Sequence, residues 1–290
     1  MTATPNTSKP KTNASSSPRV KILDQVVIGR SLNLDLCEDA IHITPDFIAV
    51  IDGASSFTAK TNTVPPTPGR IATDLIKNAI NAFPPTIKAR DAINALTVAI
   101  ATNNIFPLND VPAAAVTIVS ISRREIWQVG STAFMEIGHQ DTPVQRPYPL
   151  DIPMARLRAG YIRHLLTTTG IPSEILAETD PARDLILPFL RANVTNRNSL
   201  GPDGYGAITN TRVPDEHLII YPIKGETGKA EIIIHTDGYP ATKLTLASAE
   251  THLNNLLVED PLCIGPLVDV KGKHPKDVSY DDRAYLRVKL

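Results

Sequence analysis

The chain has 290 residues, 42% of them hydrophobic, and a formal net charge of −1. This composition supports a buried core in one large domain, and the near-neutral charge gives no reason to expect binding to nucleic acid or to an acidic membrane surface. No apolar stretch approaches the roughly 20 residues needed to cross a bilayer. The two cysteines, Cys37 and Cys263, fit no zinc or redox spacing. We therefore expect free thiols and a cytoplasmic protein without a membrane partner.

Residues 1–18 differ from the rest of the chain. They are rich in Ser, Thr, Asn, Pro and Lys and lack the apolar centre of a signal peptide. Such a segment cannot bury enough apolar surface to offset the entropy lost on ordering. The sequence therefore predicts a disordered N-terminal tail, followed by a single domain over residues 19–290.

In the first half of this domain, the spacing of apolar residues changes from the two-residue period of strands to the 3.6-residue period of helices. Residues 20–30 read as a strand, and residues 37–53 as two short strands joined by a Thr-Pro-Asp turn. Apolar residues then recur at helical spacing over 69–83 and 89–104. Residues 113–138 read as three short strands, which we interpret as a β-meander.

The second half alternates in the same way. We expect helices over 153–170, 180–194 and about 243–257, the second of them capped by Asp180 with Pro181 at its first position. Strands are expected over 203–209, 216–223, 229–236 and 280–290. This order predicts an α+β fold, in which two packed antiparallel β-sheets are flanked by helices. The helical sequence at about 150–200 is expected to form an insertion or flap.

Acidic residues mark the ends of four of these strands, as Glu38-Asp39, Asp52, Asp237 and Asp281-Asp282. Each Asp-Gly pair alone is an ordinary turn signal. Carboxylates that converge from several strand ends repel one another, and divalent cations remove that cost. Oxygen ligands without cysteine suit Mg²⁺ or Mn²⁺, and two such ions activate a water for in-line attack on phosphorus.

At these residues the sequence resembles the metal-dependent protein phosphatases of type 2C (PPM-type Ser/Thr phosphatases), as an atypical, bacterial-like member. The motifs "CEDA", "VIDGAS", "IIIHTDGYP" and "SYDDRAYLRV" occur in the family's order, with a strand hairpin between the second and the third. Together they span residues 38–289. The resemblance implies a β-sandwich fold, a centre of two Mn²⁺ or Mg²⁺ ions and hydrolysis of phosphoserine or phosphothreonine.

The resemblance also implies roles for individual residues. Asp52 would bridge the two ions and the Gly53 carbonyl would bind one of them, while Asp237 and Asp281 would hold the other. Glu38 and Asp39 would act through metal-bound waters, so that Asp52 and Asp39 activate the attacking water. Further residues near these motifs have open roles: Asp282, His235, Arg30 and Ser131.

Several positions depart from the family's pattern. Ser131 stands where an aspartate helps to bind a third metal, so the resemblance does not extend to a third site. Leu34 stands where an arginine holds the substrate phosphate, and Arg30 is close but out of register. Ala54 replaces a histidine that some members use as general acid. The Lys-rich segment 271–276 is expected to be a solvated loop, and a position near the mouth of the site is left open for it.

These observations lead to one main hypothesis and two alternatives. The main hypothesis is a Mn²⁺- or Mg²⁺-dependent phosphomonoester hydrolase that acts on a phosphorylated protein. The first alternative is a phosphatase-like regulatory or binding protein with impaired catalysis, which the residues Leu34 and Ser131 suggest. The second is a phosphatase of a phosphorylated small molecule.

Overall fold

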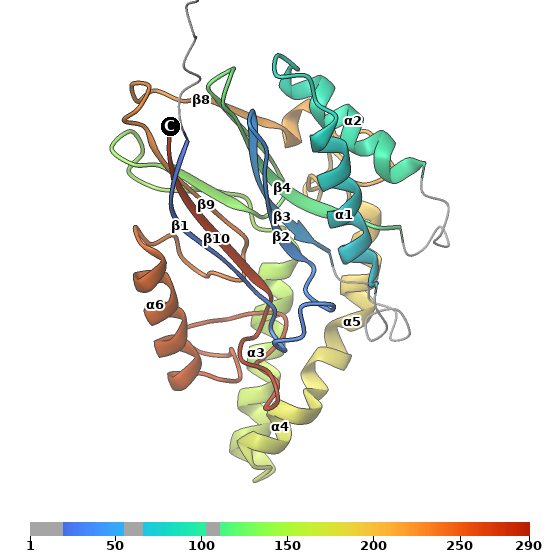
Figure 1. The fold of residues 1–290 in the computed structure, drawn as a ribbon. Coiled ribbons are helices and arrows are strands. Elements are labelled where there is room, and N and C mark those ends of the chain that lie inside the picture. The colour runs from blue at the N-terminus through green and yellow to red at the C-terminus, as the bar shows by residue number, and fades with distance from the viewer. Residues whose placement is uncertain (1–19, 55–65, 103–110) are drawn as a thin grey trace, which may run out of the picture.

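Two five-stranded sheets form the centre of the molecule (Figure 1), which a computed structural model describes over residues 20–54, 66–102 and 111–290. The expected tail over residues 1–18 lies outside the described residues. The first sheet has the order β1 (Lys21–Ile28), β10 (Arg283–Lys289), β9 (Glu231–His235), β6 (Ala133–Glu136) and β7 (Val144–Gln145). The second has the order β2 (Asp39–Ile43), β3 (Phe47–Gly53), β4 (Ala114–Ser120), β5 (Glu125–Val129) and β8 (Ile219–Pro222).

All neighbouring strands pair antiparallel. Side chains alternate between the two faces of a strand, and β3 shows this clearly. Ile48 and Val50 pack between the two sheets, whereas Phe47, Ala49 and Ile51 pack against the helices outside. The predicted fold class, two packed antiparallel sheets flanked by helices, is confirmed.

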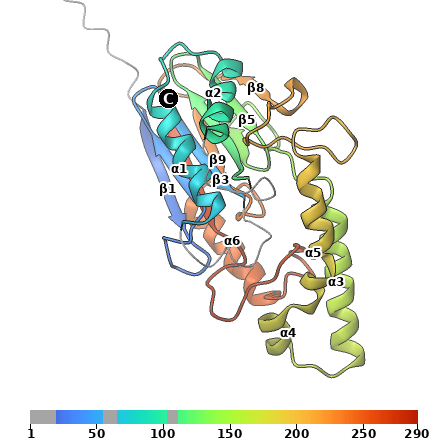
Figure 2. The same cartoon turned by 90° about the vertical axis from the view of Figure 1, so that its right-hand side faces the viewer.

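Helices cover both outer faces of this sandwich (Figures 1 and 2). The helices α1 (Pro68–Asn81) and α2 (Ala89–Ala101) cover the sheet of β3, and α6 (Leu246–Glu259) covers the sheet of β9. Thr67 caps α1 by accepting a hydrogen bond from the Arg70 amide at 3.2 Å, with Pro68 at the start of the helix. None of the helices in the described ranges is long and apolar enough to cross a bilayer.

A helical segment lies beyond one end of the sandwich (Figures 1 and 2). It consists of α3 (Asp151–Thr168), α4 (Ser173–Thr179) and α5 (Pro181–Asn193), and two short 3₁₀ turns follow at Val194–Asn196 and Asp215–His217. Asp180 caps α5 as expected, since its carboxylate accepts a hydrogen bond from the Arg183 amide at 3.1 Å. Cys37 and Cys263 are buried free thiols.

The structure corrects two expectations. The strands over 113–138 are not a meander, because β5 and β6 belong to different sheets. The chain crosses between the sheets at Gly130, which has a φ of +89°, a conformation that favours glycine. The expected strand over 203–209 is absent, and only isolated bridges occur there, at Tyr205 and Ile208. Gly204 and Gly206 interrupt this stretch, and glycine weakens strand pairing.

Gly238 brings the end of β9 against the start of β10. A Cβ atom at this position would lie 1.9 Å from the Asp282 carbonyl oxygen, which is backbone and cannot rotate away. We therefore expect Gly238→Ala to lower the free energy of unfolding by about 1–3 kcal/mol, the usual cost of overpacking. Urea unfolding followed by circular dichroism measures this change.

The matched control is Gly160→Ala in α3, where a Cβ atom would meet nothing within 4 Å. Alanine favours a helix by about 0.5–1 kcal/mol over glycine, so this variant is expected to be slightly more stable. An unchanged stability in Gly238→Ala would contradict the close approach of the two strands.

Candidate metal centre at one end of the sandwich

Asp39 and Asp52 lie side by side at the end of the β2–β3 hairpin. The two residues are directly paired across the strands. Because Asp52 follows Ile48 and Val50 at a spacing of two, its side chain points into the space between the two sheets. Its pair residue, Asp39, shares that face. The antiparallel register thus places both carboxylates at the seam of the sandwich.

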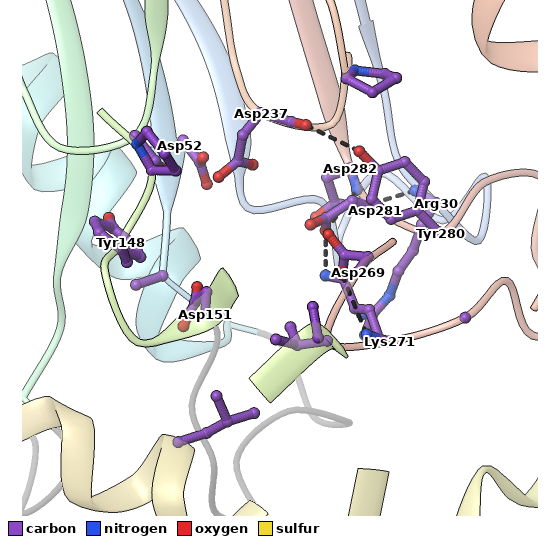
Figure 3. A pocket seen from close by; sticks show the side chains of 18 of the residues that line it. Arg30, Asp52, Tyr148, Asp151, Asp237, Asp269, Lys271, Tyr280, Asp281 and Asp282 are labelled. Atoms are coloured by element: carbon purple, nitrogen blue, oxygen red, sulfur yellow. Dashed lines mark hydrogen bonds and ion pairs between the residues drawn. The ribbon is translucent and has the colours of Figure 1, made fainter. Parts of the chain in front are cut away.

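The opposite sheet contributes Asp237, which follows the end of β9. Its side chain points toward Asp52 (Figure 3), and its charge adds to burial in raising the pKa of Asp52. The Tyr280 hydroxyl donates to the Asp237 carbonyl at 2.9 Å and fixes the backbone there. Thr236, the preceding residue, hydrogen-bonds Asp39. The two sheets therefore meet through their acidic strand ends.

Burial and mutual repulsion perturb these carboxyl groups. Burial raises the pKa of Asp39, and the charge of Asp282 raises it further. Burial and then the charge of Asp237 raise the pKa of Asp52. Asp237 has its pKa raised to about 6, first by burial and then by Asp281. A divalent cation would offset this repulsion.

Two other predicted residues, Asp282 and Glu38, border the same cluster. Their carboxylates accept hydrogen bonds that fix nearby chain segments. The Asp282 carboxylate accepts hydrogen bonds from the amides of Arg30 at 2.8 Å and Glu38 at 2.9 Å. The Glu38 carboxylate accepts a hydrogen bond from the Thr67 hydroxyl at 2.5 Å, at the cap of α1. Asp282 and Glu38 therefore fasten the chain segments that carry the cluster.

Gly53 lies against the first turn of α1. A Cβ atom here would come 2.4 Å from the Gly69 carbonyl oxygen, so only glycine fits. The Gly53 amide donates to the Glu38 carbonyl at 3.2 Å. The glycine after Asp52 thus permits close packing of a helix end against the strand end.

Ser131 and His235 have different surroundings. Burial raises the pKa values of Asp237 and Tyr148, and the Ser131 side chain lies close enough to both residues to lower these values in part. His235 is fully buried, and burial lowers its pKa to about 4, so the ring is neutral. Its Nδ1 lies 2.7 Å from the Thr236 carbonyl, which can only accept, and its Nε2 lies 2.6 Å from the Thr242 hydroxyl. Both ring nitrogens are engaged, and His235 is a packed, hydrogen-bonded residue of the strand.

One cavity of about 700 Å³ joins most of the predicted residues. Its lining includes Arg30, Glu38, Asp39, Asp52, Gly53, Ser131, Asp237, Asp281 and Asp282. The sequence did not point to several other lining residues, namely Tyr148, Asp151, Arg183 and Asp269. Tyr148 lies between β7 and α3, Asp151 and Arg183 belong to the helical segment, and Asp269 belongs to the loop that precedes β10. Lys271, from the same loop, also lines the cavity.

Lys271 corrects the expectation for segment 271–276. Only 16% of its side chain is exposed, and its ammonium group lies 2.6 Å from Asp281 Oδ1 (Figure 3). Burial lowers its pKa, but the charges of Asp281 and Asp269 outweigh burial and raise the pKa overall. Lys271 is thus a charged group within the site, and Asp281 is its partner.

The donor set fits a divalent cation at Asp39, Asp52 and Asp237. These are oxygen donors, as Mg²⁺ and Mn²⁺ prefer, and Asp39 Oδ2 is buried without a hydrogen-bond partner within the described ranges. No group of three or more His, Cys, Asp or Glu side chains in those ranges is already arranged to bind a metal ion. The site therefore fits a divalent cation by the chemistry of its donor atoms and by its charge. The carboxylates are close enough to shift one another's pKa values.

No protein-family model and no curated protein sequence matches the chain. Among solved structures, the serine/threonine phosphatase PstP/Ppp of Mycobacterium tuberculosis is similar at 14% identity and a TM-score of 0.47, covering 93% of this chain and 98% of that chain. The phosphatase Stp1 from Staphylococcus aureus is similar at 13% identity and a TM-score of 0.44, covering 93% and 94%.

A third similar structure is RsbX in complex with magnesium, at 9% identity and a TM-score of 0.45, covering 94% of this chain and all of that chain (100%). These TM-scores are all below 0.5.

Asp151, at the start of α3, makes the stability of the protein depend on pH. Burial, followed by the charge of Asp269, raises its pKa to about 7. The native state therefore binds more protons than the unfolded state between about pH 4 and pH 7, and stability falls as pH rises through this range. At about pH 8 we expect Asp151→Asn to be more stable than the wild type by on the order of 2 kcal/mol, and near pH 4 this gain disappears.

Urea unfolding in the presence of EDTA at several pH values measures this effect. The control Asp184→Asn removes an exposed carboxyl group from the first turn of α5. If the control gained as much stability, the cause would be the removal of a carboxylate from the first turn of a helix and not the burial of Asp151. A gain that is independent of pH would contradict the prediction.

Proposed function

We propose that this protein is a Mn²⁺- or Mg²⁺-dependent phosphomonoester hydrolase that acts on phosphoserine or phosphothreonine in proteins. The observation that carries the proposal is the convergence of Asp39 and Asp52 from one sheet with Asp237 from the other. All three have raised pKa values, and none of them forms a direct ion pair with a described residue, although the charge of Lys271 partly offsets that of Asp237. Metal binding is the function that makes use of such a cluster.

The carboxylates of Asp39, Asp52 and Asp237 would hold the cation. A divalent cation bound there supplies a water of lowered pKa as the nucleophile and offsets the charge that develops on the phosphoryl oxygens. Arg30 lines the same cavity and provides a guanidinium for the phosphate. The Ser131 side chain lowers the pKa of Asp237, against the larger effect of burial, and so favours its ionised, metal-binding form.

Asp151 is the proton donor that we propose for the leaving group. Ala54 has no proton to give, whereas Asp151 lines the cavity and is partly protonated near neutral pH, with a pKa of about 7. General acids work best when their pKa lies close to the operating pH. Asp151 is held at the start of α3, so the helical segment contributes to the reaction in this proposal.

The first test removes the proposed metal ligands. We expect Asp52→Asn and Asp237→Asn each to lower Mn²⁺-dependent hydrolysis of p-nitrophenyl phosphate by more than about 100-fold, because even outer partners of metal ligands typically contribute about 10- to 100-fold. The control Asp91→Asn changes an exposed carboxylate on α2 and is expected to keep full activity. Full activity in both site variants would refute the proposed function.

A substrate panel then separates the alternatives. Faster turnover of phosphoserine and phosphothreonine peptides than of glycerol phosphate supports the protein substrate, and the reverse order supports a small molecule. A second candidate function, a phosphatase-like binding protein without catalysis, is favoured by the ion pair between Lys271 and Asp281, which engages a predicted ligand. Metal-independent binding of phosphopeptides without turnover would support it.

The second test concerns Asp151. Nitrophenolate leaves without protonation, whereas the serine alkoxide requires a proton. We therefore expect Asp151→Asn to lower hydrolysis of a phosphoserine peptide by about 100-fold and that of p-nitrophenyl phosphate much less. Asp184→Asn serves again as the control. Equal losses for the two substrates would exclude Asp151 as the general acid.

A further inference from the structure

Lys271 occupies a position in the acidic site that is unusual for a lysine. Its ammonium group lies 2.6 Å from Asp281 Oδ1, with the carboxylate of Asp269 close by (Figure 3). Lys271 and Asp281 are 16% and 27% exposed, so water screens their attraction only partly. One positive charge is therefore already present at Asp281.

The loop that carries Lys271 is firmly anchored. Arg158 of α3 is only 1% exposed and donates hydrogen bonds to the carbonyls of Leu262 at 2.9 Å, Cys263 at 3.2 Å and Asp269 at 3.1 Å. Arg183 of α5 donates to the Val270 carbonyl at 2.7 Å. These bonds fix the backbone of the loop at its beginning and again immediately before Lys271.

Arg158 is itself held in place. Its guanidinium forms an ion pair with Asp180 at 2.9 Å, at the junction of α4 and α5. Gly272 packs directly on it, since a Cβ atom there would lie 2.8 Å from Arg158 Nη2. The Lys271 amide also donates to Asp269 Oδ1 at 3.1 Å. Lys271 is thus built into the site and not a surface side chain that happens to reach it.

The remaining carboxylates of the cluster contrast with Asp281. Asp39, Asp52 and Asp237 form no ion pair with any residue of the described ranges, whereas Asp281 has its own cation. The charge of Lys271 also lowers the pKa of Asp237, but the only direct ion pair of Lys271 within the described ranges is with Asp281. The cluster is therefore divided into a part without a directly paired cation and a part that contains one.

We propose that Lys271 takes the place of a second divalent cation, so that the site binds one ion instead of two. This inference rests on the proposed function, because it concerns the same metal centre. The single ion is held by Asp39, Asp52 and Asp237, and Asp281 remains paired with Lys271. A second ion would have to displace a buried ammonium group from an anchored loop.

The test counts bound ions in the full-length protein. Titration with MnCl₂ by isothermal calorimetry, with free Mn²⁺ followed by electron paramagnetic resonance, gives the stoichiometry without any assay of activity. We expect one Mn²⁺ per chain in the wild type and two in Lys271→Gln. The control Lys276→Gln, which changes an exposed lysine of the same segment, is expected to bind one.

A second variant keeps the inference testable if Lys271→Gln does not fold. Asp281→Asn removes the partner of Lys271 but no ligand of the single ion, so it is expected to retain one Mn²⁺ per chain, bound more weakly because the Lys271 ammonium group is left unpaired. Loss of an ion in Asp281→Asn would overturn the inference.

The outcomes distinguish this inference from the proposed function. Two ions in the wild type, or one ion in a folded Lys271→Gln, would overturn the role of Lys271 and leave the phosphatase proposal standing. No bound Mn²⁺ in the wild type would overturn both. Hydrolysis that is lost in Asp52→Asn while the wild type binds one ion would support both.

Discussion

The meeting of acidic strand ends at the seam between the two sheets is the constraint on which the rest of the site depends. Asp39 and Asp52 come from one sheet and Asp237 from the other, so the packing of the sandwich itself sets their separation. Asp39 is buried and the other two are partly buried. In addition to burial, the charges of Asp237 and Asp39 raise the pKa of Asp52, and Asp237 also raises that of Asp39. In the absence of a cation this arrangement costs free energy, and proteins retain such a cost mainly where function requires it.

The surroundings of the seam hold the chain so that repulsion cannot push the strand ends apart. Gly238 permits the end of β9 to touch the Asp282 carbonyl, and Tyr280 fixes the Asp237 backbone through a hydrogen bond. The Asp282 carboxylate in turn accepts two amide hydrogen bonds from the segment between β1 and β2. Residues that the sequence suggested as ligands thus divide into those that face the seam and those that fix its geometry.

Much of this arrangement could be predicted from the sequence. Apolar runs that end in Asp-Gly gave the strands and placed Asp52 and Asp237 at their ends, since a period of two and a turn signal are both local properties. The pairing of β6 with β9 could not be predicted in this way. It depends on the corner at Gly130, where a single backbone conformation sends the chain to the other sheet.

The ion pair of Lys271 with Asp281 could not be predicted from the sequence for a different reason. A lysine in a stretch with Gly272 and Pro275 has the local signature of a solvated loop, which is what segment 271–276 predicts. Its burial arises from tertiary contacts, chiefly the hydrogen bonds of Arg158 to three carbonyls of the loop. Arg158 belongs to a helix more than a hundred residues earlier in the chain, and no pattern near Lys271 records that contact.

These same contacts make the helical segment and the acidic seam one mechanical unit. Arg158 and Arg183 belong to α3 and α5, and both bind the backbone of the loop that carries Asp269 and Lys271. A shift of the helices relative to the sandwich would break these bonds and move the ammonium group away from Asp281, because the ion pair depends on the position of the loop. Asp151 would move with α3, since it lies in the first turn of that helix. The charge balance of the seam is therefore set by the docking of the helical segment as well as by the sheets.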